Sequence, residues 1–426
     1  MRAALWLLIL FCIAAAVALF AGNNQGTVTV FWPPYRLDFS LNMVLLLLLG
    51  GFVLLYAALR AIASLLSLPH QARRWRVQQK ERAMHLALLD GLAHRMAGRF
   101  IRARKAAEAA LAQESALADA KESPPHALQL RTLAHLMAAQ SAHALQDSTG
   151  RDAHLQKALA DIAPPATSTQ VQELREGAHL RAARWAIDDR DASAALEWLA
   201  ALPVGAARRT LALRIRLKAT RLAGRTQEAL DTARLLAKHR AFSPAAAHSI
   251  MRGLATELID GAHDTEQLQN IWLSLEASER AMPELAVHAA QRLSMLGGEA
   301  SQVRTWLLPV WERMVADPEA LATPYRIRLF RTLEAGLESV DANWLARIET
   351  AQQRNPRDTG LQYLAGVACF KRQLWGRAQM LLGTAAQNLQ DTDLRTSAWR
   401  YLAALAEQRG DAEATASAWK QAALVH

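Results

Sequence analysis

Two long apolar runs at the amino end of the chain limit what it can fold into. Residues 3–21 and 41–59 contain no charged side chain, and each is long enough to cross the roughly 30 Å hydrocarbon core of a bilayer as a helix. The sequence therefore predicts a membrane anchor over residues 1–68, with transmembrane helices at about 3–21 and 41–66 joined by a short periplasmic loop, 22–40.

The first run also has features of a secretory signal, because Arg2 gives it a basic start and small residues lie at Ala14–Ala18. The run is longer than the usual apolar core of a signal, which favours a retained helix. Cleavage would still leave the second run as an anchor. Both alternatives keep the rest of the chain attached to a membrane.

Most of the net charge lies directly after the second run. Residues 69–105 hold ten Lys/Arg and two Asp/Glu, a surplus of eight (10 − 2) in a chain whose net charge is +10. Because such cations mark the cytoplasmic side, both termini are expected in the cytoplasm. A basic juxtamembrane segment, 69–82, is expected to meet anionic lipid headgroups through Arg73, Arg74, Arg76, Lys80 and Arg82. This role accounts for the basic composition, so no nucleic-acid partner is predicted.

The connection between the two runs favours extended structure. Residues 27–32 are rich in β-branched and aromatic side chains, Pro33 and Pro34 interrupt them, and 35–39 partly alternate. This pattern predicts a small hairpin-like loop. Trp32 and Tyr35 suit the headgroup zone, and a periplasmic contact site is the alternative reading.

The remaining residues, 83–426, predict an all-α repeat domain. Their composition favours helices of 10 to 20 residues separated by prolines. Residues 211–218 alternate like a strand, but their Ala-rich flanks and place in a repeat favour a helix. Turns aligned on Gly98, Arg190, Gly224, Gly261, Gly298, Ser339, Gln373 and Gly410 are separated by 92, 34, 37, 37, 41, 34 and 37 residues. The spacing predicts eight or nine stacked helical hairpins, with room for an additional turn in the first interval.

The last repeat shows the clearest pattern of large and small residues. Trp399, Leu402, Ala403, Gly410, Trp419 and Ala422 have the spacing W-x2-L-A-x6-G-x8-W-x2-A, which resembles the tetratricopeptide pattern. Small residues allow two helices to approach, and the aromatic is expected to fill the gap against a neighbouring helix. Ala103, Ala107 and Ala110 in the first repeat, and Gly366, Ala378 and Ala385 in the penultimate one, fit the same pattern.

These features together resemble the HemY family, proteobacterial inner-membrane proteins with tetratricopeptide repeats assigned to late protohaem IX biosynthesis. The resemblance rests on the two membrane runs, the loop with NNQG and WPP, and the basic RRWR that precedes the repeats. It implies a multi-pass protein of the bacterial inner membrane that acts near ferrochelatase, protoporphyrinogen oxidase or coproporphyrinogen oxidase. The family supplies no catalytic residues to transfer.

The residues themselves agree that the chain is not an enzyme. The sequence lacks G-x-G-x-x-G, G-x-S-x-G, G-x4-G-K-[ST], H-E-x-x-H, C-x-x-C and C-x-x-C-H. Two cysteines, Cys12 and Cys369, provide neither a zinc cluster nor a disulfide framework. Catalytic residues and metal ligands are therefore predicted to be absent. The thirteen histidines, among them His135 and His143 on one helical stretch, leave haem or porphyrin binding open without requiring a cofactor.

The arrangement of cations predicts a binding groove. Arg214, Lys218 and Arg221 share one helical face, because they are spaced i, i+4, i+7. Six basic residues are expected on first helices of hairpins, which line the concave side of tetratricopeptide solenoids: Arg184, Arg214, Lys218, Arg221, Lys371 and Arg400. Such a groove would attract acidic peptides or porphyrin carboxylates. The prediction is a scaffold for late haem synthesis, and the alternative is an adaptor for lipopolysaccharide assembly or quality control.

Overall fold

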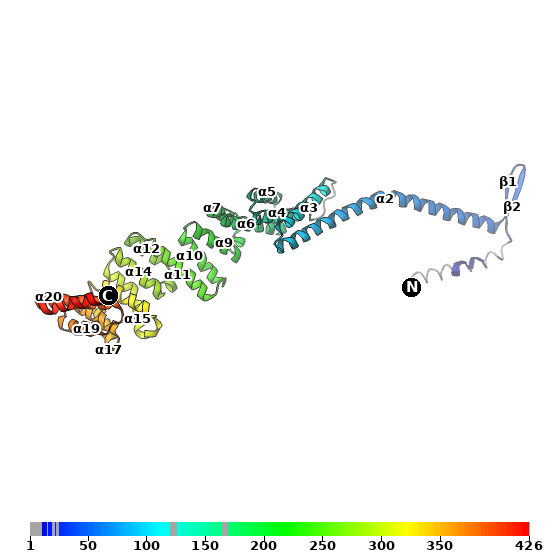
Figure 1. Ribbon diagram of the computed structural model, residues 1–426. Coiled ribbons are helices and arrows are strands. Elements are labelled where there is room, and N and C mark those ends of the chain that lie inside the picture. The colour runs from blue at the N-terminus through cyan, green and yellow to red at the C-terminus, as the bar shows by residue number, and fades with distance from the viewer. Residues whose placement is uncertain are drawn as a thin grey trace. The chain divides into compact units, whose positions relative to one another are not determined.

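The computed structural model describes residues 11–14, 16–18, 22, 25–119, 126–163 and 169–425. Contacts divide the chain into two compact units, Met1–Leu174 and Arg175–His426, which are described separately (Figure 1). The first predicted membrane helix, 3–21, falls mostly outside these residues, although 11–14 and 16–18 are helical.

A two-stranded hairpin forms the predicted loop. Strand β1 (Thr27–Trp32) pairs antiparallel with β2 (Tyr35–Ser40), in register from Thr27 opposite Ser40 to Trp32 opposite Tyr35. Pro33 and Pro34 occupy the turn, where a missing backbone N–H costs no ladder bond. The backbone N–H of Leu41 donates to the carbonyl of Gly26 at 2.8 Å, which fixes the hairpin to the helix that follows.

That helix, α2 (Leu41–Met96), is 56 residues long, or about 84 Å at the usual rise. Ser40 caps its start by accepting from the N–H of Met43 at 3.3 Å. In the described part of the chain, one helical stretch, Leu41–Ser64, has the length and mean hydropathy (24 residues, 2.3) of a membrane span. The predicted boundaries at residues 68 and 82 both fall inside α2, so the anchor, the basic segment and the first repeat share one continuous helix.

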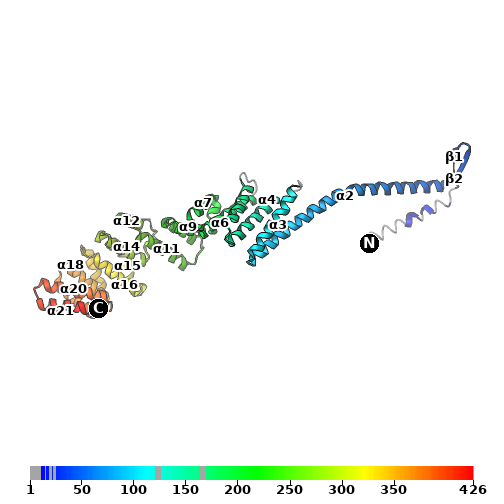
Figure 2. The ribbon, with the colours of Figure 1, turned by 45° about the horizontal axis from the view of Figure 1, so that its top comes forward.

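The rest of the first unit consists of helical hairpins. Its helices are α3 (Phe100–Ala118), α4 (Ala127–Ala144) and α5 (Ser148–Asp161), and α6 (Thr169–Asp188) crosses into the second unit. Figure 2 shows α3 and α4 beside the carboxyl end of α2, in agreement with their contacts. Ala103, Ala107 and Ala110 of α3 are at most 1 % exposed. The predicted role of small residues at this crossing is confirmed.

The second unit continues the same hairpin architecture. Its elements are α7 (Ala192–Ala200), α8 (Val204–Ala207), α9 (Thr210–Leu222), α10 (Thr226–Lys238), α11 (Pro244–Asp260), α12 (Thr265–Ser274), α13 (Ala277–Arg280), α14 (Pro283–Met295), α15 (Ala300–Ala316), η1 (Pro318–Ala320), α16 (Thr323–Ala335), α17 (Ala342–Arg354), α18 (Thr359–Lys371), α19 (Trp375–Asn388), α20 (Thr392–Gln408) and α21 (Ala412–Leu424). The chain is mostly helical, as predicted. First helices of successive pairs contact one another, as α14 does α16, α16 does α18 and α18 does α20.

The turns between paired helices agree largely with the predicted alignment. Five of the aligned residues have positive φ: Gly98, Arg190, Gly224, Gln373 and Gly410. In one turn Gly297, not Gly298, takes this conformation, and Gly261 has a φ of −72°. Gln146, with a φ of 60°, forms a turn between α4 and α5 that the alignment did not contain. This turn fills the first long interval.

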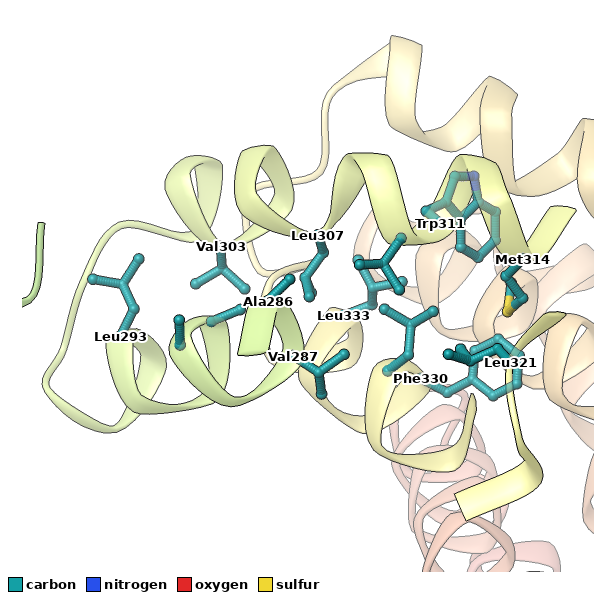
Figure 3. Packing of buried hydrophobic residues seen from close by; sticks show 14 of the residues in the cluster. Ala286, Val287, Leu293, Val303, Leu307, Trp311, Met314, Leu321, Phe330 and Leu333 are labelled. Carbon is teal, nitrogen blue, oxygen red and sulfur yellow. The ribbon is translucent and has the colours of Figure 1, made fainter. Parts of the chain in front are cut away.

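A continuous apolar core joins the helices of the second unit from α9 to α20, and α6 and α7 pack against α9 in smaller clusters. Figure 3 shows side chains of α14, α15 and α16 meeting in it, including Val287, Leu307 and Leu333. In the last hairpin Ala403, Ala418 and Ala422 are buried. Of the two aromatic residues in the repeat pattern, Trp399 packs against the apolar core, as expected. Trp419 is 46 % exposed and donates from Nε1 to Glu407 at 2.9 Å, so it does not fill a gap between helices.

Candidate partner-binding face

The basic face of α9 follows from which sides of this helix are covered. Ala212 and Leu213 are both buried, and so are Ala219 and Thr220. A helix can bury adjacent residues on one broad side, whereas a strand would point the two members of each pair to opposite faces. Arg214, Lys218 and Arg221 are therefore left exposed on the remaining face. The sequence-based expectation that these three residues share a helical face agrees with the structure.

Arg214 also has a structural role. Its Nη2 donates to the carbonyl of Ala241 at 2.7 Å, and its guanidinium lies over the ring of Phe242, 5.8 Å from the centroid. These contacts tie α9 to the connection between α10 and α11. Within this face, Lys218 and Arg221 are thus the cations whose replacement tests binding with the least effect on folding.

The other predicted groove residues also lie on first helices, but only Arg184 is on a helix that packs against α9. Arg184 projects from α6, whose Ala183 and Ala186 pack against α9. Lys371 is half-buried at the end of α18, and Arg400 is exposed on α20. Because α11, α14 and α16 intervene between α9 and α18, the six residues form two groups: Arg184 with the α9 face, and Lys371 with Arg400.

Ion pairs are also found on the helices between these two groups. Arg331 of α16 contacts both Asp391 and Asp393 at the start of α20. Arg252 of α11 lies 3.6 Å from Glu284 of α14. The six predicted residues therefore do not form one continuous row. The α9 face, together with Arg184 on the adjoining helix, is the larger of the two groups.

A cavity of about 450 Å³ lies between α16 and the starts of α18 and α20. Its cation Arg326 is paired with Asp358, and Asp358 also caps α18 by accepting from the N–H groups of Gly360 and Leu361. Two carboxylates, Asp358 and Asp391, also line this cavity beside Arg326 and Arg357, so it is a weaker candidate for an acidic partner than the α9 face.

The predicted membrane-surface cations all belong to α2. Arg74, Arg76 and Arg82 are exposed, whereas Lys80 is half-buried and donates from Nζ to the carbonyl of Ala116 of α3 at 3.4 Å. The side chain of Arg73 lies outside the described part of the structure. Lys80 thus contributes to the α2–α3 contact as well as to the basic segment.

The histidines pair in a way that the sequence did not reveal. His135 of α4 lies with Nδ1 3.0 Å from Nδ1 of His154 of α5, and its helix neighbour His143 lies near Arg151 instead. Burial lowers the pKa of His135 to about 4, and the pKa of His154 is also lowered, chiefly by burial. Both rings are thus neutral at neutral pH, with one N–H donating to the other nitrogen. Across the residues described, no group of three or more His, Cys, Asp or Glu could hold a metal.

This pair predicts acid sensitivity of the first unit. Because folding lowers the pKa of His135 from 6.5 to about 4, the unfolded chain binds more protons between these values, and the free energy of unfolding falls as pH falls through this window. We expect a loss on the order of 2 kcal/mol, measured as urea unfolding at a series of pH values. His135→Phe should make the free energy of unfolding of the first unit depend less on pH. His85→Phe, at an exposed position, should leave this pH dependence unchanged.

Residues 26–146 match the family model described as HemY protein N-terminus. The match confirms the resemblance to the HemY family that the sequence indicates, and it covers the hairpin, α2, α3 and α4. No curated protein matches the chain.

Three solved structures are similar to much of the chain, each at 14 % identity. The P58(IPK) TPR domain has a TM-score of 0.21 and a match covering 78 % of this chain and 99 % of that chain. The APC/C hetero-tetramer Cut9-Hcn1 has a TM-score of 0.29, with 80 % and 66 % covered, and Naa15/Naa10 bound to HypK-THB has 0.23, with 77 % and 57 %. At these TM-scores the fold is argued from the helix packing of the chain itself.

Proposed function

We propose that this protein is a membrane-anchored scaffold that supports late steps of haem synthesis and catalyses none of them. The observation that carries the proposal is the HemY match over residues 26–146, joined to stacked helical hairpins with an exposed cationic face on α9. Hairpin repeats provide extended surfaces suited to binding other proteins. The resemblance to the HemY family supports the choice of pathway, and the repeats favour binding over catalysis.

The proposed ligands carry negative charge. Lys218 and Arg221 can pair with carboxylates of an acidic protein segment or with the propionates of a porphyrin. By family resemblance, the proteins bound would be ferrochelatase, protoporphyrinogen oxidase or coproporphyrinogen oxidase. The cations of α2 near the span would meet anionic lipids.

We place the protein in the inner membrane with both termini in the cytoplasm. The cations after Leu41–Ser64 support this orientation. Reporter fusions at residues 30 and 120 test it, with the first expected in the periplasm and the second in the cytoplasm. A periplasmic reporter at residue 120 would remove the access to haem-pathway enzymes that the proposal requires.

Deleting the protein is expected to make porphyrin precursors accumulate, and wild-type chain should reverse the accumulation. Lys218→Glu/Arg221→Glu should fail to reverse it, because two exposed cations become acidic while the apolar sides of α9 are unchanged. Extracted pigments and membrane levels of the protein are the measurements. Lys238→Glu/Lys420→Glu, at exposed positions of second helices, is the matched control and should complement.

Unchanged porphyrins after deletion, accompanied by altered lipopolysaccharide, would reject this function in favour of an envelope adaptor. Full complementation by the α9 double variant would leave the pathway role standing but remove the α9 face as the binding site. A variant with His135→Ala and His143→Ala should complement, and its failure together with loss of bound porphyrin would assign binding to the histidines.

A further inference from the structure

The cytoplasmic half of α2 has an apolar face that no described element covers. Met84 and Gly91 are buried toward the neighbouring helices, and a Cβ on Gly91 would come 3.4 Å from Ala106 of α3. The other side of α2 is open: Leu86 is 60 %, Leu89 62 % and Met96 81 % exposed. Such a face in contact with water is unusual for a helix in a folded protein.

The exposed face repeats every seven residues. Trp75, Arg82, Leu89 and Met96 follow one another at this interval, and Leu92 and Leu86 lie beside them. Helices that pack lengthwise against a parallel partner typically have two rows of apolar side chains at seven-residue spacing. The row of Trp75, Leu89 and Met96 is one of them, and the second row here contains Gln78, His85 and Leu92. Arg82 is the one charged residue in the row, and a single polar residue at such a position sets the register of a coiled coil at some cost in stability.

The seven-residue spacing continues without interruption into the membrane span. On a straight helix such a row drifts by about 20° per heptad, so two copies that pack along it would have to coil around each other in a left-handed sense. Counting back from Trp75 in steps of seven reaches Leu68, Ala61, Leu54 and Leu47, and the neighbouring row contains Ser64, Ala57 and Gly50. Leu47 and Leu54 are exposed, as are the small residues of the second row. Small residues allow close approach of helices in lipid. One face of α2 is thus suited to helix packing on both sides of the membrane surface.

We propose that two copies of this chain pair in parallel along α2, through the row that contains Leu54, Trp75, Leu89 and Met96. Copies anchored in one membrane begin α2 at the same depth and in the same direction, so identical residues face each other. At the flanking positions of a parallel pair, Arg74 would oppose Gln79 and Glu81 would oppose Leu86. Within the row, Arg82 would face Arg82 of the second copy, which is a cost that the apolar contacts on either side have to offset. The inference requires α2 to cross the membrane, but it does not depend on the haem-pathway role.

Lipid is a poorer occupant for this face. The helix continues unbroken past Ser64, so Met96 lies about 48 Å further along it, beyond the headgroups of a bilayer that the span crosses. A second copy, by contrast, accompanies α2 along its whole length.

Disulfide cross-linking of the full chain in its native membranes tests the proposal. In a background with Cys12→Ala and Cys369→Ala, single cysteines at Leu54→Cys and Leu89→Cys should give disulfide-linked dimers on oxidation with copper phenanthroline. Leu55→Cys and Ala83→Cys, exposed positions one residue beyond the row, should give little. Leu89→Arg/Leu92→Arg should also reduce the mass of the detergent-solubilised chain from two copies to one, and Ala83→Arg should not.

Three results would overturn the proposal. Absence of a dimer at Leu89→Cys would show that the cytoplasmic row does not face a second copy. Equal cross-linking at all four positions would indicate random collision. A cross-linked product at Leu89→Cys with the mass of a different protein would assign the face to another partner.

Discussion

Replacing Arg234 by Leu is expected to lower the free energy of unfolding around α10 and α13 by about 3 to 5 kcal/mol. Arg234 donates from Nε and Nη2 to the two carboxylate oxygens of Glu279, at 2.9 and 2.6 Å, and Glu279 is only 1 % exposed. Removing the cation leaves a buried carboxylate without a counter-charge, which costs far more than losing a surface ion pair.

Hydrogen exchange of the detergent-solubilised chain measures this loss locally. Peptides covering α10 and α13 should exchange two to three orders of magnitude faster in Arg234→Leu, since about 1.4 kcal/mol corresponds to a factor of ten. The double variant Arg234→Leu/Glu279→Gln should recover much of the protection, because no buried charge remains and the amide oxygen can still accept from the N–H of Glu276. Equal exchange in the single and double variants would contradict this account.

Contacts between residues far apart in the sequence explain why the basic groove is only partly predicted. Helical periodicity placed Arg214, Lys218 and Arg221 on one face, because this relation depends only on the spacing within α9. It could not show that Arg331 meets Asp391, sixty residues away, or that the stacking of α11, α14 and α16 separates the predicted groove residues into two groups. Contacts between hairpins depend on how successive pairs stack, and the residue spacing carries no signal for that geometry.

Details of the fold that depend on local sequence patterns are predicted correctly, and those that depend on contacts without a local pattern are not. Small residues at helix crossings were predictable, since Ala103 and Ala107 must allow one helix to approach the next within a single hairpin. The turn at Gln146 was missed because it has no glycine and residues 112–170 lack the repeat pattern. The His135–His154 contact joins two helices across that same turn, so it could not be predicted either.

The length of α2 was underestimated for a different reason. Pro69 and the change from apolar to basic residues favour a boundary between the anchor and the repeats. The helix nevertheless continues to Met96. An uninterrupted helix joins the apolar stretch to the first hairpin, and no break interrupts the seven-residue spacing between Leu47 and Met96. The proposed pairing of two copies depends on this continuity.

Introducing a larger side chain at Gly366 is expected to push apart α18 and α19, the two helices of the penultimate hairpin. A Cβ at this position would lie 2.7 Å from Cγ and 3.1 Å from the backbone N of Leu382 on α19, closer than these atoms allow. Because Leu382 is fully buried and its backbone cannot move without displacing α19, Gly366→Val should cost about 3 kcal/mol.

The matched control lies in the partner helix. Nothing is within 4 Å of a Cβ added at Gly376 of α19, so Gly376→Ala should instead stabilise the hairpin by about 0.5 to 1 kcal/mol, through the better helix propensity of alanine. Urea unfolding and hydrogen exchange of peptides from α18 and α19 measure both changes. A fall in the free energy of unfolding for Gly366→Val together with a rise for Gly376→Ala would show that Gly366 is required for the close approach of α18 to α19. A loss of stability in both variants, or in neither, would reject close packing at Gly366 as the reason for glycine at this position.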